Sequence, residues 1–430
     1  MRQFFAKADS PSRRDFLAAT AKATLGVSAL GFPGTAFATD IARVTKTYAP
    51  AKRMIYLYMG GGMSQLDTFT PKPEASKYIK GPLKPISTSA DGVQVSELMP
   101  ITAKQMHNAV VVETMSSNQG AHEQGAYVMH TNYAMRGTIE HPGIGSWISQ
   151  LGGKINPALP PGVVIGGGSR IYGSGYMETK HSPLPIGRPD RGLDNSYRPD
   201  TVTEEDYHRR LNLSLAMSKQ FMRKYNSRSV RAYKDVYLEA LRLMKSEDLE
   251  VFDISKEPDY IRDAYGSDNF AQGCLLARRL VERNVRYVEV RLGGWDTHTN
   301  NFNALDGLVG RLDRGMGTLL ADLSARGLLE ETMVVLTTEF GRTPDINEAD
   351  GRDHYPTIFT SVLAGGGVAG GQVYGKSSVD GKEIVENKVT VADFHATVGH
   401  AMGLAHEQRI LAPNGRPFTM GNKGKPLAIF

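Results

Sequence analysis

Residues 334–355 read VVLTTEFGRTPDINEADGRDHY, and here an apolar, β-branched run ends abruptly in charged and imidazole side chains. The run is typical of a short strand buried on both faces inside a parallel sheet. In open α/β sheets, functional sites gather at the carboxyl ends of such strands. The candidates that this stretch supplies are Glu339, Arg342, Asp353 and His354. A simple salt bridge between Glu339 and Arg342 is the alternative explanation for two of them.

Further apolar runs predict the rest of a sheet. They fall at residues 53–59, 108–114, 161–166, 285–292, 332–338 and 359–363. Segments with helical spacing of apolar residues lie between them, most clearly at residues 201–250. This alternation predicts an α/β fold with a mostly parallel central sheet flanked by helices. We expect residues 39–430 to form one domain, with residues 201–262 as a helical insertion.

Acidic and imidazole residues follow two of the other predicted strands. Asp67 comes after residues 53–59 and a glycine run, which favours either a metal ligand or a turn-capping carboxylate. Asp296 and His298 follow residues 285–292, and aspartate with neutral histidine is a familiar pair of zinc ligands. An aspartate that only orients a structural histidine is the alternative for this pair.

The strand at residues 108–114 leads into a polar turn, residues 116–122 (SSNQGAH), before a helical segment. This is a setting in which a nucleophile or an anion site uses helix amides. Ser116, Ser117, Asn118 and His122 compete for that role. Our candidates for catalysis are Ser117 and His122 in this turn, together with Arg342 as a group that steadies an anion. A solvated loop with one capping serine is the alternative.

The composition narrows the function classes. The 430 residues carry a formal net charge of +5 spread along the chain, with no basic stripe, so nucleic-acid binding has little support. The single cysteine, Cys274, excludes an intramolecular disulfide and a multi-cysteine metal site.

The amino terminus carries a specific targeting pattern. Residues 12–17 (SRRDFL) match a twin-arginine export motif, a mildly apolar stretch follows at residues 17–32, and residues 36–38 (AFA) fit a small-x-small cleavage site. We therefore predict a signal peptide at residues 1–38. The mature protein is expected outside the cytoplasmic membrane, in the periplasm or secreted, without a transmembrane segment.

Carboxylates gathered at one sheet edge would repel one another unless cations or protons balanced them, which argues for metal. One or two divalent ions, chosen from zinc, manganese, calcium and magnesium, could polarise an ester oxygen and activate a hydroxyl or water.

Four stretches give the chain a resemblance to the secreted family called domain of unknown function 1501, a branch of the alkaline phosphatase and sulfatase superfamily. They are residues 60–73 (GGGMSQLDTFTPKP), 120–133 (GAHEQGAYVMHTNY), 293–302 (GGWDTHTNNF) and 338–355 (TEFGRTPDINEADGRDHY). The resemblance covers nearly the whole mature chain and implies an alkaline phosphatase-like fold.

By the same resemblance, two metal ions have separate ligand sets. One set is Asp67 with Glu339, the other is Asp296, His298 and His354, and the nucleophile falls near residues 116–122. Two departures matter. Phe340 stands where the superfamily commonly has a histidine ligand, a gap that His122 could fill. The cysteine-or-serine-x-Pro-x-Arg pattern of formylglycine sulfatases is absent from the mature sequence.

Two functional hypotheses follow. The first is an exported metal-dependent hydrolase of phosphate or sulfate esters, whose substrate is an anionic ester or polysaccharide. The second is a catalytically inactive relative that binds an envelope polysaccharide or a partner protein through the same pocket.

Overall fold

A computed structural model describes residues 51–430, apart from residues 168–169, 194–195, 197–200 and 226–227. The predicted signal peptide lies outside the described residues, so it stays a prediction. In the part of the chain that is described, no helix is both long and apolar enough to cross a membrane.

The described residues form a nine-stranded sheet in the order β12-β4-β11-β8-β1-β7-β5-β6, with β15 beside β4. Its strands are β1 (Arg53–Gly60), β4 (Ala109–Ser116), β5 (Gly162–Ile165), β6 (Leu184–Ile186), β7 (Tyr287–Gly293), β8 (Thr332–Thr337), β11 (Phe359–Ala364), β12 (Gln372–Tyr374) and β15 (Val389–Thr390). All neighbouring pairs are parallel except those that β11 makes with β8 and β4. The carboxyl ends of β1, β4, β7 and β8 therefore meet at one edge of the sheet.

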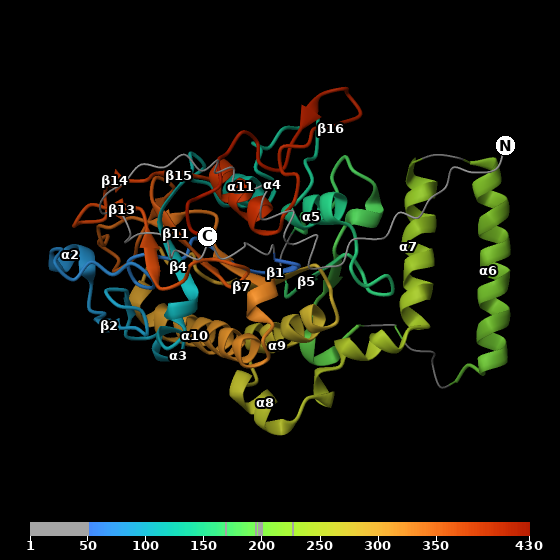
Figure 1. Cartoon of the computed structure of the whole chain (residues 1–430), viewed down its shortest axis with the longest axis horizontal. Helices are drawn as coiled ribbons and strands as arrows, with labels where there is room; N and C mark the ends of the chain where they lie inside the picture. The colour runs from blue at the N-terminus through green and yellow to red at the C-terminus, as the bar shows by residue number, and fades with distance from the viewer. Residues whose placement is uncertain (1–50, 168–169, 194–195, 197–200, 226–227) are drawn as a thin grey trace, which may run out of the picture. The chain divides into compact units, whose positions relative to one another are not determined.

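Helices cover both faces of the sheet (Figure 1). One apolar core joins sheet residues such as Leu57 and Val290 to α9 (Asn269–Glu282) and α10 (Asn301–Ala325). The other core joins the opposite face to α4 (His122–Thr131), α5 (Ile144–Gly152) and α11 (Val391–Ala401). The predicted α/β class, with a mostly parallel sheet between helices, is thus confirmed.

Shorter helices, two further long helices and three two-stranded pairs are also part of the described structure. The other helices are α2 (Lys77–Lys80), α3 (Pro100–Ala103), α6 (Glu204–Lys224), α7 (Arg228–Met244) and α8 (Asp259–Tyr265). Within residues 201–262, the segment predicted as an insertion, the described structure is helical, and a hydrogen bond of 3.2 Å from Tyr237 Oη to Ser214 Oγ joins α7 to α6. Two-stranded pairs are β2 (Pro85–Ser87) with β3 (Gln94–Ser96), β13 (Lys376–Ser377) with β14 (Ile384–Glu386), and β16 (Ile410–Leu411) with β17 (Pro417–Phe418).

The stretch at residues 334–355 is a strand followed by a ribbon that returns to the same edge. After β8 the chain forms β9 (Gly341–Arg342), which pairs antiparallel with β10 (His354–Tyr355), so that Arg342 lies opposite His354. The chain then reverses into β11. This path explains how Glu339 and His354, 15 positions apart in sequence, both reach the carboxyl edge of the sheet.

Candidate metal centre

Three histidines converge on one aspartate at this edge. The Nε2 atom of His122 lies 3.2 Å from Asp296 Oδ2, and the Nε2 atoms of His298 and His354 lie 3.1 and 3.2 Å from Asp296 Oδ1. Suitable ligand atoms of His122, Asp296 and His354 all lie within 4.8 Å of one another. These side chains come from the ends of β4 and β7 and from β10, so the fold, and not local sequence, brings them together.

Each imidazole has its other nitrogen held by an acceptor. The Nδ1 atom of His122 lies 2.9 Å from Glu339 Oε1, that of His298 lies 2.7 Å from Asp353 Oδ1, and that of His354 lies 2.7 Å from the carbonyl oxygen of Gly120. Because an acceptor requires a proton on Nδ1, the neutral form of each ring presents a lone pair at Nε2. A carboxylate or carbonyl behind the ring is the usual support of a metal-binding histidine.

The converging nitrogens are poorly satisfied without a cation. The Nε2 atoms of His298 and His354 lie 3.0 Å apart, and two lone pairs at that distance repel. The Nε2 atom of His122 is buried, yet among the described residues no group completes a hydrogen bond with it, in spite of its closeness to Asp296. Orphaned nitrogens of this kind, facing a carboxylate, fit the donor set of a divalent transition metal.

The charges at the site point the same way. Asp296, Glu339 and Asp353 are three carboxylates, and the guanidinium of Arg342 pairs with Asp296 at 2.6 Å. With neutral imidazoles, three negative charges and one positive charge leave an excess of two, which one divalent ion balances.

Protonation of the imidazole is the other way to supply positive charge. The hydrogen bond to Glu339 raises the pKa of His122 above its usual value, against the effect of burial. Burial favours the neutral form of Asp296, but hydrogen bonds from Arg342 and His354 outweigh it and hold the pKa of that carboxyl well below its usual range. The site therefore keeps a charged carboxylate and attracts protons to an imidazole, as expected where a cation can bind.

Phe340, the residue found where a ligand was expected, supports the imidazole rings. Its side chain is fully buried, and its ring centroid lies 5.0 Å from that of His122 and 4.4 Å from that of His354. The phenyl ring thus packs against both imidazole rings and restricts their orientation.

Two glycines allow the loops of this edge to cross. A Cβ atom on Gly61, whose φ is +116°, would lie 2.6 Å from the backbone nitrogen of Asp296. A Cβ atom on Gly351 would lie 1.8 Å from the carbonyl oxygen of His298. Larger residues at either position would push the backbone that carries two of the four converging residues.

The structure does not bring Asp67 to this group. Its carboxylate accepts bonds from Arg352 Nε at 2.8 Å, Arg352 Nη2 at 3.0 Å, Ser64 Oγ at 2.6 Å and Asn301 Nδ2 at 3.0 Å. Asp67 and Arg352 are both fully buried. With both oxygens engaged, Asp67 holds loops together in this structure, and its role as a metal ligand, which the resemblance implied, stays a prediction.

Glu339 and Arg342 are at the site in supporting positions. Glu339 Oε1 accepts from Gly61 N at 2.8 Å and from His122, and its Oε2 accepts from Tyr58 Oη at 2.9 Å. The predicted alternative of a Glu339–Arg342 salt bridge is not what forms, because Arg342 pairs with Asp296. Glu339 thus contacts the His122 ring, and its predicted role as a metal ligand stays a prediction.

Ser117 follows β4 without joining the cluster. Its Oγ accepts a bond of 3.2 Å from Gln119 N, and its backbone nitrogen donates to the carbonyl of Pro356 at 2.9 Å. Ser117 as the nucleophile stays a prediction.

A cavity of about 610 Å³ adjoins the cluster and contains residues that the sequence did not single out. His122 and Glu339 line it on one side, and Arg170, Tyr172 and Arg291 line it as well. A signal for Arg291 was present: β7 reads YVEVRLG, and two opposite charges at alternate positions of an otherwise apolar strand are unusual. No comparable signal marks Arg170, which lies in an irregular segment.

Comparison with solved structures finds distant similarity to a sulfatase, an alkaline phosphatase and a lipoteichoic acid synthase. The sulfatase PsFucS1 from Pseudoalteromonas sp. is 13% identical with a TM-score of 0.41, over 84% of this chain and 69% of that one. The alkaline phosphatase from the Antarctic bacterium TAB5 is 14% identical with a TM-score of 0.37, over 76% and 95%. The lipoteichoic acid synthase LtaP from Listeria monocytogenes is 7% identical with a TM-score of 0.41, over 86% and 75%.

The sequence itself assigns the family. The model of the family described as "Protein of unknown function (DUF1501)" matches residues 51–429, so the chain belongs to this family, as its four motifs predicted. No curated protein matches the chain.

Proposed function

We propose that this protein is an exported, metal-dependent hydrolase of phosphate or sulfate esters. The observation that carries the proposal is the convergence of three histidine Nε2 atoms on Asp296, each ring held from behind by an acceptor. Residues that only stabilise a fold do not need three matched lone pairs at one point.

His122, Asp296 and His354 would hold one divalent ion, and His298 lies close enough to Asp296 and His354 to complete that site or to contribute to a second. A divalent ion bound there would polarise an ester oxygen and lower the pKa of an attacking water or hydroxyl. Zinc suits this histidine-rich set best, and manganese, magnesium and calcium are the other candidates.

The residues around the centre have distinct tasks. Glu339, Asp353 and the carbonyl of Gly120 fix the ring orientations. Arg342 holds Asp296 in its charged form. The amino terminus of α4 begins at His122 and no side chain caps it, so its amides place partial positive charge beside an anionic ester.

The test begins with protein purified from a host that exports it. We expect close to one or two equivalents of a divalent metal by elemental analysis, and hydrolysis of 4-nitrophenyl phosphate or 4-nitrophenyl sulfate. Asp296→Asn should lose both, whereas Asp345→Asn, an exposed aspartate of the same β9–β10 connection, should keep both. Absence of metal, with no hydrolysis after zinc, manganese, calcium or magnesium is added, would refute the proposal.

The inactive-relative hypothesis keeps one point in its favour. Within the described part of the chain, no serine or threonine hydroxyl bonds to the converging side chains, and Ser117 bonds elsewhere. Protein that binds metal and an anionic polysaccharide but hydrolyses neither ester would support this second function.

A further inference from the structure

Each guanidinium nitrogen of Arg342, the arginine that we expected to steady the substrate anion, already has an acceptor inside the protein. Arg342 is fully buried, and its guanidinium donates to the carbonyls of Gly62 at 2.8 Å, Arg352 at 3.0 Å and Gly61, and to Asp296 at 2.6 Å. A substrate anion would have to displace a backbone carbonyl or Asp296 to reach it. The cation that binds substrate therefore has to be sought elsewhere.

Arg291 has the capacity that Arg342 lacks. Its Nε donates to Glu289 Oε1 at 2.6 Å and its Nη1 donates to the carbonyl of Arg170 at 2.7 Å. Its Nη2 is buried and finds no hydrogen-bond partner among the residues that the structure describes. Leaving a buried charged donor unpaired is costly, so this atom marks the place of a ligand acceptor.

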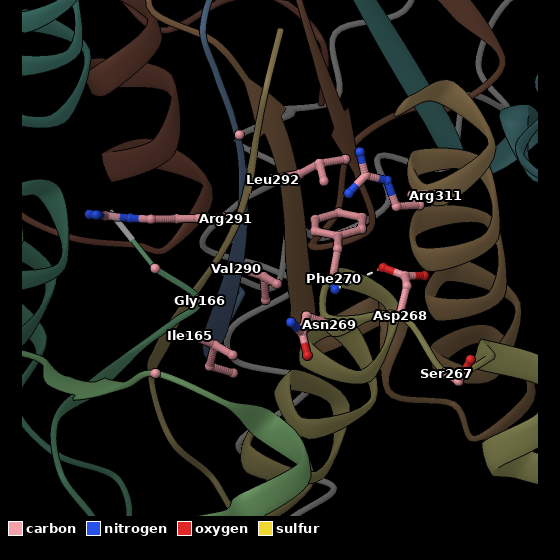
Figure 2. Close-up of a pocket in the computed structure, with 13 residues that line it drawn as sticks. Ile165, Gly166, Ser267, Asp268, Asn269, Phe270, Val290, Arg291, Leu292 and Arg311 are labelled. Atoms are coloured by element: carbon pink, nitrogen blue, oxygen red, sulfur yellow. Dashed lines mark hydrogen bonds between the residues drawn. The ribbon is translucent and has the colours of Figure 1, made fainter. Parts of the chain in front are cut away.

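The direction of Arg291 places it in the cavity beside the metal centre. Arg291 pairs with Tyr58 of β1 in the sheet register, and both residues line that cavity together with His122 and Glu339. A second cavity, of about 460 Å³, lies on the other face at the start of α9. Arg291 also lines this second cavity, but Figure 2 shows that its guanidinium points away from Phe270 and Arg311 on the opposite side of that cavity.

The carboxylate that pairs with Arg291 is shared with other side chains. Glu289 accepts from Arg291 Nε at 2.6 Å, also lies 3.2 Å from His130 Nε2, and accepts from Tyr287 Oη at 2.7 Å. Glu289 therefore divides its hydrogen bonds among three side chains and occupies only the Nε side of the Arg291 guanidinium, which leaves Nη2 free for another acceptor.

Arg170 adds a second guanidinium at the rim. Its ion pairs with Glu123 and Glu140 are long, at 3.5 and 3.3 Å, and both carboxylates are mostly exposed, so solvent weakens these pairs. Its guanidinium lies 5.7 Å from the centre of the Tyr172 ring, which also lines the cavity. An organic anion could therefore reach Arg170 and Arg291 from the same space.

We propose that Arg291, with Arg170 at the rim, binds a second oxyanion group of the substrate, separate from the ester that reaches the metal centre. The substrate class is then an organic phosphate or sulfate ester whose alcohol part bears a carboxylate, sulfate or phosphate. The cavity volume of about 610 Å³ is within the range of small-molecule sites, and the rings of Tyr58 and Tyr172 provide flat walls for the part of the substrate that joins the two anionic groups. This inference rests on the proposed function for the identity of the ester, but not for the binding of the anion.

The test is calorimetric titration of inorganic sulfate into chelator-treated, metal-free protein at constant ionic strength. We expect wild type to bind sulfate and Arg291→Gln to bind it about 10- to 100-fold more weakly, because a charge-assisted hydrogen bond is lost. Arg170→Gln should weaken binding less. Arg311→Gln is the matched control, since Arg311 is an exposed arginine of the second cavity (Figure 2), and it should change nothing.

A second variant guards against a folding defect, because Arg291→Gln leaves Glu289 with fewer partners. The double variant Glu289→Gln, Arg291→Gln removes both charges and should fold, as circular dichroism would show, yet still bind sulfate weakly. No binding by wild type, equal binding by wild type and both Arg291 variants, or an equal loss in Arg311→Gln would each overturn the inference. The proposed function fails by a different result, namely no metal and no hydrolysis.

Discussion

Asp67 and Asp296 follow neighbouring strands of the same sheet, and the sequence presents them as equivalent carboxylates. Asp67 is fully buried and accepts four bonds, two of them from the buried guanidinium of Arg352. Asp296 is about half exposed, with a side-chain exposure of 48%, and has three imidazole nitrogens within 3.2 Å. The first environment is complete without a ligand and the second is not.

The difference shows that a carboxylate at a strand end becomes a candidate ligand only if its neighbours leave its oxygens available. Asp67 has lost that availability to an arginine 285 positions away in the sequence. The oxygens of Asp296 stay available because most of its neighbours are imidazole nitrogens. Those nitrogens, like the carboxylate itself, are best satisfied by a cation. Exchange of single side chains can test whether the two regions are as different as this comparison implies.

The largest effect is expected from Asp67→Ala. Removal of this carboxylate leaves the buried guanidinium of Arg352 without its counter-charge, which costs about 3–5 kcal/mol in the free energy of unfolding. Urea denaturation of the metal-free protein would measure the loss, with Asp345→Asn as an exposed control that stays within about 0.5 kcal/mol. A stable Asp67→Ala variant that had lost its metal would mean that Asp67 is a ligand after all.

Asp296→Asn should give the opposite profile. Metal affinity is expected to fall by more than about 100-fold, since loss of a ligand exceeds the loss caused by an outer-shell change. The metal-free protein should lose only about 1 kcal/mol, because Arg342 keeps its three carbonyl acceptors. Competition with a chromophoric chelator would give the affinity. An Asn variant with unchanged affinity would remove Asp296 from the centre.

Asp353→Asn tests an orienting residue. Asp353 accepts from His298 Nδ1 at 2.7 Å without reaching the converging nitrogens itself. An asparagine amide can turn its oxygen to His298 but carries no charge, so we expect metal affinity to fall by about 10-fold, at the low end of the range for outer-shell groups. The chelator competition used for Asp296→Asn measures it, and a result equal to wild type would show that His298 needs no orienting carboxylate.

The sequence predicted the six longer strands of the sheet, because buried strands are continuous apolar runs that stand out between helices, but it did not predict the short strands β6, β12 and β15. The predicted strands at residues 53–59 and 332–338 differ from β1 and β8 by one residue at one end. Family membership was also recognisable, because the four motifs are long and ordered.

The roles within the site were less predictable, because they depend on which partner reaches each charge. The residues around Asp67 in the sequence do not indicate that Arg352 will be its partner. Those around Arg342 do not indicate that backbone carbonyls will accept the hydrogen bonds of its guanidinium. Phe340 was misleading in the other direction. In the sequence it stands where a metal ligand was expected and so argued against a metal site, but in the structure its ring packs against the imidazoles of His122 and His354. Single residues in a motif therefore indicate where a functional site lies, whereas the hydrogen-bond partners of each residue decide its role in that site.

The smallest expected effect concerns pH. The bond to Glu339 raises the pKa of His122 in the folded, metal-free protein above the usual 6.5, so the folded state holds this proton more tightly than the unfolded state does. The resulting stabilisation is fully present below about pH 6.5 and is lost as the pH rises through the raised, folded-state pKa. Because the His122 side chain is 38% exposed, solvent screening limits the effect to below about 1 kcal/mol.

Urea denaturation with chelator present, between about pH 6 and pH 9, would measure this decline. His122→Gln should flatten it, and His107→Gln, which replaces an exposed histidine at the amino end of β4, the opposite end of that strand from the centre, should not. With metal bound the trend is expected to reverse, because the metal requires an unprotonated Nε2 and its binding strengthens as the pH rises. No such reversal of the pH trend is expected from Asp67. Its oxygens already accept hydrogen bonds from buried donors, and we do not expect a metal ion to displace them. A wild-type protein whose stability follows the same pH trend with and without metal would therefore contradict the distinction between the two carboxylates.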